Sequence, residues 1–200
     1  MIEITKGKFR RLNEPIKGKP NYLRIVSERF EVEEPDGPGI IGPAVREFIH
    51  TRNAVAVLPI CPSEQKILIA RQFRMPVMHD TGDYQRAWIY EALAGVISDG
   101  EDPIDCGVRE TLEESSVVVL PERMKLVADY YVSPGVSSER HYVFTCEVDA
   151  AEPSEPSGGL EEEHEALKPA WLTFDEIRAL RSGGRIEDGK TIMALMSAGL

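Results

Sequence analysis

The chain has 200 residues, of which 42% are hydrophobic and 28% charged, as expected of a globular domain rather than a disordered chain. Its 34 acidic and 23 basic residues give a formal net charge of −11, which argues against a general nucleic-acid-binding protein. A phosphorylated substrate would need local arginines or a metal ion to offset this charge.

The first residues lack the apolar segment of a signal peptide, and no stretch approaches the roughly 18 apolar residues of a membrane span. The three cysteines, Cys61, Cys106 and Cys146, are widely spaced and form neither a zinc motif nor a disulfide framework. We therefore expect three reduced thiols in or near the core of a cytoplasmic protein with no membrane or nucleic-acid partner.

The N-terminal quarter of the chain looks like β-structure. Residues 22–34 alternate as in a strand pair, residues 35–39 are a turn signal, and residues 44–51 continue as strand. Few large apolar residues occur here, so this segment must pack on the main domain or on a second subunit. We expect residues 1–48 to be an N-terminal β-extension and residues 49–200 the main domain.

The next elements are clearer. Residues 53–75 contain two apolar runs around a turn and predict a buried hairpin. Residues 79–85 read as a loop, residues 86–95 as a strand ending at Gly95, and residues 98–103 as a turn.

A helix is predicted from Pro103 to Ser115, with Asp102 as its N-cap. Gly107 would cost about 1 kcal/mol against alanine inside a helix, which close packing on a strand would explain. Acidic residues should lie off the apolar face, whose members are Ile104, Val108, Thr111 and Leu112.

Towards the C-terminus, strands, a loop and two short helices are predicted. The strands are residues 125–133, 140–149 and 166–174, the loop is 150–165, and the helices are 174–184 and 190–200. This order predicts a mixed α/β or α+β fold with helix–sheet–helix layering.

Three glutamates crowd one segment of the predicted helix. Glu110 lies three and four positions before Glu113 and Glu114, a spacing at which like charges destabilise a helix by a few tenths of a kcal/mol per pair. A hard cation would neutralise them, and Mg²⁺ prefers oxygen ligands and bridges to substrate phosphates.

The spacing around these glutamates resembles the Nudix box, G-x5-E-x7-R-E-U-x-E-E-x-G-U, where U is a bulky aliphatic residue. The chain departs from it at Thr111, where an aliphatic residue is usual, and at Ser116, where glycine is usual. The matching positions are Gly95, Glu101, Arg109, Glu110, Glu113, Glu114 and Val117.

The resemblance implies a Nudix fold, a mixed sheet between helices, and a divalent metal site for Mg²⁺, with Mn²⁺ as a substitute. It pairs Arg109 with Glu101 as an orienting group of the catalytic cluster. Its implied metal ligands are the main-chain carbonyl of Ala94 and the carboxylates of Glu110, Glu113 and Glu114, with Glu113 also counted as catalytic.

Three stretches outside the box, residues 69–75, 90–95 and 133–140, resemble the ADP-ribose and nucleotide-sugar pyrophosphatases of this superfamily. The resemblance implies that Arg74 holds substrate phosphates and that Glu91 lies in the substrate site near the metals. It makes Glu139 the general base or a metal ligand. Glu162 and Glu163, in an acidic loop, are the alternatives for the base.

The function implied is Mg²⁺-dependent hydrolysis of ADP-ribose, or a related nucleoside diphosphosugar, to AMP and ribose 5-phosphate or the corresponding products. The subgroup implies a homodimer formed through the N-terminal strands. A GDP-mannose-type hydrolase and a non-catalytic nucleotide-binding module are the rivals, and the complete set of box glutamates argues against the second.

Residues 184–191, GRIEDGKT, match the phosphate-binding pattern G-x4-G-K-[ST]. That loop needs a strand before it and a helix inside a parallel sheet after it. Here a helix precedes it and two acids lie inside it, so we interpret it as a helix-capping turn. The DGKT part of this segment, near the C-terminus, resembles a stretch of the GDP-mannose-type members of the same subgroup. The four histidines have no metal-ligand spacing and are expected at the surface or hydrogen-bonded.

Overall fold

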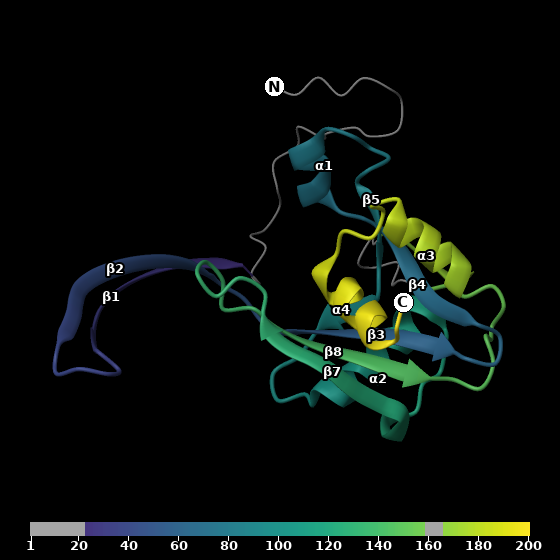
Figure 1. Cartoon of the computed structure of the whole chain (residues 1–200), viewed down its shortest axis with the longest axis horizontal. Helices are drawn as coiled ribbons and strands as arrows, with labels where there is room; N and C mark the ends of the chain where they lie inside the picture. The colour runs from purple at the N-terminus through teal and green to yellow at the C-terminus, as the bar shows by residue number, and fades with distance from the viewer. Residues whose placement is uncertain (1–22, 159–165) are drawn as a thin grey trace.

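The computed structural model describes residues 23–158 and 166–200. A seven-stranded mixed sheet lies between helices, and a separate two-stranded ribbon extends from one end (Figure 1). The strands of the main sheet are β3 (Ala54–Cys61), β4 (Lys66–Phe73), β5 (Trp88–Glu91), β6 (Leu93–Val96), β7 (Met124–Tyr131), β8 (Arg140–Glu147) and β9 (Leu167–Thr173). The helices are α1 (Met75–Thr81), α2 (Pro103–Ser115), α3 (Phe174–Ser182) and α4 (Gly189–Ser197), with a 3-10 turn η1 (Pro121–Arg123).

Alternate side chains of β3 point to opposite faces of the sheet, as strand geometry requires. Val55 and Val57 pack in one core cluster with Cys106 of α2. Ala56 and Leu58 pack in the other cluster, which α3 and α4 cover. The predicted α/β class with helix–sheet–helix layering is therefore confirmed, and all three cysteines are buried and free, as expected.

The predicted hairpin of β3 and β4 is present, but it pairs only at Ile60–Ile67 and Cys61–Lys66 before the strands separate. The gap is filled by β5, which pairs with β4, and by β6, which pairs with β3. The prediction of one strand over residues 86–95 is wrong, because its two halves bind different partners and the strand breaks at Ala92. This break carries several of the predicted site residues.

The predicted loop at residues 79–85 is wrong in its first three residues. They complete α1, which begins after Arg74 with a proline in its first turn and ends at Gly82 in the left-handed conformation. The loop proper therefore starts at Gly82.

Helix α2 has the predicted bounds, and the Asp102 carboxylate accepts the Ile104 N–H at 2.8 Å as N-cap. Gly107 is explained by close packing, because a Cβ there would lie 2.9 Å from Cγ2 of Val57. The predicted apolar face is wrong at Leu112, which is 49% exposed. The helix instead buries small residues and one acid: Cys106, Gly107, Thr111, Glu114 and Ser115.

The C-terminal helices follow local signals. Thr173 and Glu176 form a capping box at the start of α3, and Gly183 ends it. Asp188 caps α4 by accepting the Thr191 N–H, so the GRIEDGKT segment is confirmed as a helix-capping turn. Among the described residues, no helix has the length and apolar character needed to span a membrane.

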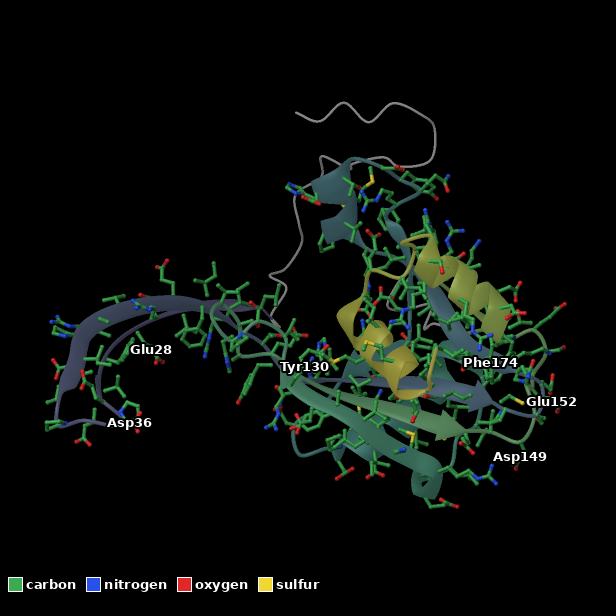
Figure 2. The ribbon with its side chains drawn as sticks, in the orientation of Figure 1. Glu28, Asp36, Tyr130, Asp149, Glu152 and Phe174 are labelled. Carbon is green, nitrogen blue, oxygen red and sulfur yellow. The ribbon has the colours of Figure 1, made fainter. Side chains whose placement is uncertain are left out.

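The N-terminal ribbon pairs β1 (Arg24–Glu33) with β2 (Ile40–His50) in antiparallel register. The prediction of a strand pair within residues 22–34 is wrong, because β1 is a single strand there and its partner β2 lies across the predicted turn. Figure 2 shows Glu28 and Asp36 on this ribbon, far from Phe174 in the body. Many of its large apolar side chains are exposed; Ile25, for example, is 79% exposed.

Candidate active site

The site begins where α2 crosses β6. The carboxylate of Glu110 lies over Gly95, and a Cβ at Gly95 would be only 1.8 Å from Cδ of Glu110. Only glycine leaves room for that carboxylate against the strand. The glycine and the first glutamate of the motif are therefore coupled sterically across 15 positions of sequence.

Arg109 gathers the acidic residues around it. Its Nε and Nη2 donate to the two oxygens of Glu101 at 2.9 and 3.2 Å, and its Nη1 donates to Glu110 at 2.8 Å and Glu113 at 3.0 Å. The hydrogen bond from Arg109 lowers the pKa of Glu101 to about 2. Arg109 and Glu101 thus form the expected pair, and Arg109 also binds two predicted metal ligands.

Glu114 lies deeper than predicted. It is 5% exposed, and its Oε2 accepts the Ala94 N–H at 2.9 Å. It therefore stands on the buried side of α2 rather than off the apolar face, because α2 packs on β6 through that side. This bond brings the carboxylate to Ala94, whose carbonyl is the predicted main-chain ligand.

Ser116 ends α2 in the left-handed conformation, with φ 60°, where the motif usually has glycine. Its Oγ donates to the Ser157 carbonyl at 2.7 Å. Next to it, a Cβ on Gly158 would lie 2.1 Å from the carbonyl carbon of Glu114. The chain entering the acidic loop thus rests directly on the end of α2.

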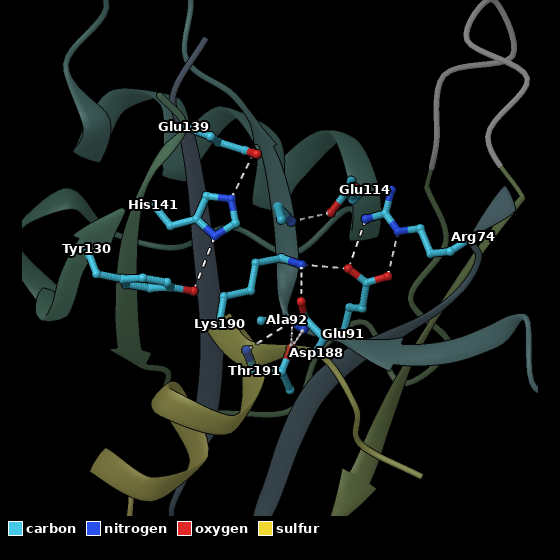
Figure 3. A network of polar contacts seen from close by, with 11 residues as sticks. Arg74, Glu91, Ala92, Glu114, Tyr130, Glu139, His141, Asp188, Lys190 and Thr191 are labelled. Carbon is cyan, nitrogen blue, oxygen red and sulfur yellow. Dashed lines mark hydrogen bonds and ion pairs between the residues drawn. The ribbon is translucent and has the colours of Figure 1, made fainter. Parts of the chain in front are cut away.

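A second group lies at the β5–β6 break (Figure 3). Arg74 donates to both oxygens of Glu91, from Nε at 2.6 Å and from Nη2 at 2.9 Å. Lys190 of α4 donates to Glu91 at 2.6 Å and to Asp188 at 2.8 Å. Burial raises the pKa of Glu91, but Arg74 and Lys190 outweigh it and hold the pKa below its ordinary value.

Glu139 reaches the site from the loop between β7 and β8. His141 lies 3.0 Å from Glu139 through Nε2 and 3.3 Å from the Tyr130 hydroxyl through Nδ1. The hydrogen bond with His141 lowers the pKa of Glu139. Figure 3 shows this chain of three side chains across from Lys190. His141 is therefore a hydrogen-bonded histidine, as expected.

The base of the N-terminal ribbon is joined to this loop. The Ile49 N–H donates to the Val136 carbonyl at 2.8 Å, and the Ser138 N–H donates to the Ile49 carbonyl at 3.0 Å. The His50 Nδ1 lies 3.1 Å from the Ser138 hydroxyl. The residue before Glu139 is thus attached to the end of β2.

The structure brings the predicted residues together in three groups. The first group lies at the junction of α2 and β6 and contains Ala94, Arg109, Glu110, Glu113 and Glu114. The second group contains Arg74 and Glu91, and the third contains Glu139. Within residues 23–158 and 166–200, no three acidic, histidine or cysteine side chains already converge as a metal centre. Glu162 and Glu163 lie outside the described residues.

The donor set nevertheless fits a divalent cation of the Mg²⁺ type. It offers three carboxylates and one carbonyl from a single helix–strand junction, all hard oxygen donors. The sequence does not single out Lys190, because the helix-capping interpretation of its phosphate-loop-like motif gives the lysine no role. Asp188, two residues earlier, signals the helix cap but not the buried ion pair.

An acidic helix seated on a strand glycine, inside a helix–sheet–helix sandwich, thus gathers hard oxygen donors of the kind that a divalent cation prefers. The family model described as the NUDIX domain matches residues 50–195. The chain belongs to the Nudix family.

Several relatives share most of the chain. A GDP-mannose pyrophosphatase of Pectobacterium atrosepticum is 31% identical over 169 residues, which cover 84% of this chain and 83% of the relative. An ADP-ribose pyrophosphatase of Escherichia coli (strain K12) is 30% identical over 150 residues, 75% of this chain and 69% of the relative. A GDP-mannose pyrophosphatase of Yersinia pestis is 28% identical over 178 residues, 89% and 85% of the two chains. The chain is a hydrolase of the class that acts on phosphorus-containing anhydrides.

Proposed function

We propose that this hydrolase cleaves the diphosphate bond of ADP-ribose or a related nucleoside diphosphosugar in the presence of Mg²⁺, giving a nucleoside monophosphate and a sugar phosphate. The observation that carries the proposal is the seating of Glu110 over Gly95 beside Glu114 and Ala94. A solvated acidic helix face would not need a glycine under one carboxylate.

In this proposal the box residues hold the cation. Glu110, Glu113, Glu114 and the Ala94 carbonyl are the ligands for Mg²⁺, with Mn²⁺ as a substitute. Arg109 donates to two of these carboxylates and is itself oriented by Glu101. When bound, the cation neutralises charge on the diphosphate and activates a water molecule.

The remaining residues handle substrate and proton. Arg74 binds the phosphates, and Glu91 holds its guanidinium in one plane. Glu139 accepts the proton of the attacking water while His141 fixes its carboxylate. The water oxygen forms a bond to one phosphorus as the P–O bond from that phosphorus to the bridging oxygen breaks. The other phosphate leaves with the bridging oxygen, so the products are a nucleoside monophosphate and a sugar phosphate.

The second candidate substrate is GDP-mannose or a similar nucleotide sugar. The DGKT stretch, which resembles the GDP-mannose-type members, and the relatives named GDP-mannose pyrophosphatase favour it. A non-catalytic binding module is disfavoured because the box glutamates are complete and two of them are positioned by specific contacts.

The test is phosphate release coupled to alkaline phosphatase, which acts on the monophosphate products but not on the intact diphosphosugar. The panel contains ADP-ribose, GDP-mannose, ADP-glucose, UDP-glucose and NADH, each with Mg²⁺. Because alkaline phosphatase attacks 8-oxo-dGTP directly, this compound is followed instead by chromatography of the monophosphate product. Glu114→Gln is the blank, since the amide oxygen can still accept the Ala94 N–H. Turnover of a diphosphosugar that is lost in Glu114→Gln supports the proposal. No turnover of any diphosphosugar, with ADP-ribose binding retained, refutes it in favour of a binding module.

We further propose a homodimer in which the ribbon of β1 and β2 packs on a second copy, in the reducing cytoplasm. Exposed Ile25 and Val45 on a two-stranded ribbon need a covering surface, and three free buried thiols suit a reducing compartment. Light scattering should give twice the 22.3 kDa of one chain, and Ile25→Asp should shift it to the monomer mass. A monomeric wild type would refute the dimer.

A further inference from the structure

The DGKT segment does more than cap α4. Its lysine and threonine point back to the β5–β6 break, which carries Glu91 and Ala92 (Figure 3). This is the part of the sheet where the β3–β4 hairpin has separated and β5 and β6 fill the gap. A segment 99 residues away in sequence therefore holds the junction that presents the site.

Lys190 is placed as an internal counter-cation. It is 7% exposed, and its ammonium lies 2.6 Å from Glu91 and 2.8 Å from Asp188. Replacing a buried ion pair by apolar residues is often neutral or stabilising, so stability alone is weak grounds for such a pair. Both printed contacts of the ammonium are with carboxylates of the protein itself, so its charge acts first on Glu91 and Asp188.

Glu91 links Lys190 to Arg74, because its carboxylate accepts hydrogen bonds from both side chains. The Oε2 of Glu91 accepts from Lys190 and from Nη2 of Arg74, while Oε1 accepts from Nε of Arg74. Glu91 is buried, whereas the Arg74 side chain is 37% exposed. Two parallel hydrogen bonds fix the plane and the direction of a guanidinium. The buried Lys190–Glu91 pair therefore holds the partly exposed Arg74 side chain from the inside.

Thr191 secures the same junction through the main chain. Its Oγ1 accepts the Ala92 N–H at 2.7 Å and lies 2.5 Å from Asp188 Oδ2. The Ala92 amide stands at the strand break. Two residues further on, the Ala94 N–H donates to Glu114. The turn of α4 and the carboxylate of α2 thus hold the same short strand from two sides.

We propose that Lys190 is a positioning residue for the hydrolase: with Thr191 it holds the β5–β6 break, and through Glu91 it sets the direction of the Arg74 guanidinium toward the substrate diphosphate. This inference rests on the proposed function, which gives Arg74 the phosphates.

The first test needs no substrate. In ¹⁵N NMR spectra of the free protein, the Nε–H of Arg74 should give a dispersed, slowly exchanging signal, assigned by its absence in Arg74→Lys. Lys190→Met should shift this signal to the position of mobile arginines and speed its exchange. Leu195→Ala, a core truncation on the same helix with no polar contact, should leave the signal in place while lowering stability.

Lys190→Gln is a second variant for the case in which Lys190→Met does not fold. Glutamine is uncharged, yet its amide can still donate to the carboxylates of Glu91 and Asp188. An unchanged Arg74 signal in both Lys190 variants would overturn the inference. Equal loss of the signal in Leu195→Ala would also overturn it, because the effect would then follow from loosening α4.

The second test measures ADP-ribose binding in EDTA by calorimetry, so that neither metal nor turnover enters. Lys190→Met should weaken binding on the order of tenfold, and the double variant with Arg74→Gln should bind no worse than Arg74→Gln alone. Additive losses would mean that Lys190 does not act through Arg74. If the wild type neither binds nor cleaves any diphosphosugar, the proposed function fails, and the NMR test still decides the positioning of Arg74.

Discussion

Gly95→Ala should separate activity from stability. The new methyl would lie 1.8 Å from Cδ of Glu110, 2.0 Å from Oε1 and 2.3 Å from Oε2. All three atoms belong to the mobile end of one side chain, so Glu110 can rotate away. Gly95 has an ordinary negative-φ strand backbone that alanine also adopts.

The magnitudes follow from this geometry. Expelling Glu110 removes its partly exposed contact with Arg109, which contributes about 0–1 kcal/mol, and alanine regains about 0.5–1 kcal/mol over glycine in a strand. The free energy of unfolding should therefore change by less than about 1 kcal/mol. Displacing a metal ligand should lower kcat/KM by about 100-fold or more, equivalent to about 2.7 kcal/mol.

The assay is kcat/KM on the best diphosphosugar over a series of Mg²⁺ concentrations, with urea unfolding of the same samples. Val96→Ala, one residue further along β6 and 41% exposed, is the matched control and should match the wild type in activity. Glu110→Ala should reproduce the loss, and Gly95→Ala in that background should cost little more.

Activity of Gly95→Ala within threefold of the wild type, with the same Mg²⁺ dependence, would refute the reasoning. So would full additivity with Glu110→Ala, because the glycine would then act by some route other than making room for the carboxylate.

Three further predictions concern α2 and its pair with the preceding loop. Ser116→Gly should be about 1 kcal/mol more stable than Ser116→Ala in urea unfolding, since only glycine takes φ 60° without cost; equal stabilities would refute this. Thr111→Val should keep turnover and change stability by less than about 1 kcal/mol, because the Gly107 carbonyl that its hydroxyl contacts is also part of the helix ladder; a loss above about 2 kcal/mol would show the hydroxyl to be essential. The Arg109 hydrogen bond holds the folded pKa of Glu101 at about 2, below the ordinary 4.5, so the stability it supplies is present above about pH 4.5 and is lost as pH falls toward 2. In Glu101→Gln the midpoint of urea unfolding should depend less on pH between about 4.5 and 2. The same pH dependence as in the wild type would contradict the lowered pKa of Glu101.

The bounds of α2 could be predicted from the sequence because its signals are local. Asp102, Pro103 and the turn after Ser115 fix the ends of this helix within a few residues of chain. The spacing of Gly95 and Glu110 could also be recognised, since the motif fixes it. Its physical reason, a carboxylate over a strand glycine, needed the packing of α2 on β6.

The errors arose where distant partners decide. Residues 86–95 alternate like one strand, but the splitting of β3 from β4 gives its halves different neighbours and breaks it at Ala92. Leu112 fits an apolar stripe by spacing, yet α2 approaches the sheet through Gly107 and Thr111, where small side chains allow close contact. Lys190 was missed because its partner Glu91 lies 99 residues earlier in the chain.

The ribbon of β1 and β2 has a consequence for local unfolding. Within the described residues of one chain, the ribbon is a separate two-stranded sheet, so wherever a second copy does not cover it the amides near its tip should exchange with solvent hydrogen far faster than those of β3. Its base behaves differently, because Ile49 shares two main-chain hydrogen bonds with the loop that leads to Glu139. Slow exchange should therefore begin near Ile49. A partner that holds the ribbon in place should also slow the exchange of amides in the loop that presents Glu139, because the two segments share these hydrogen bonds.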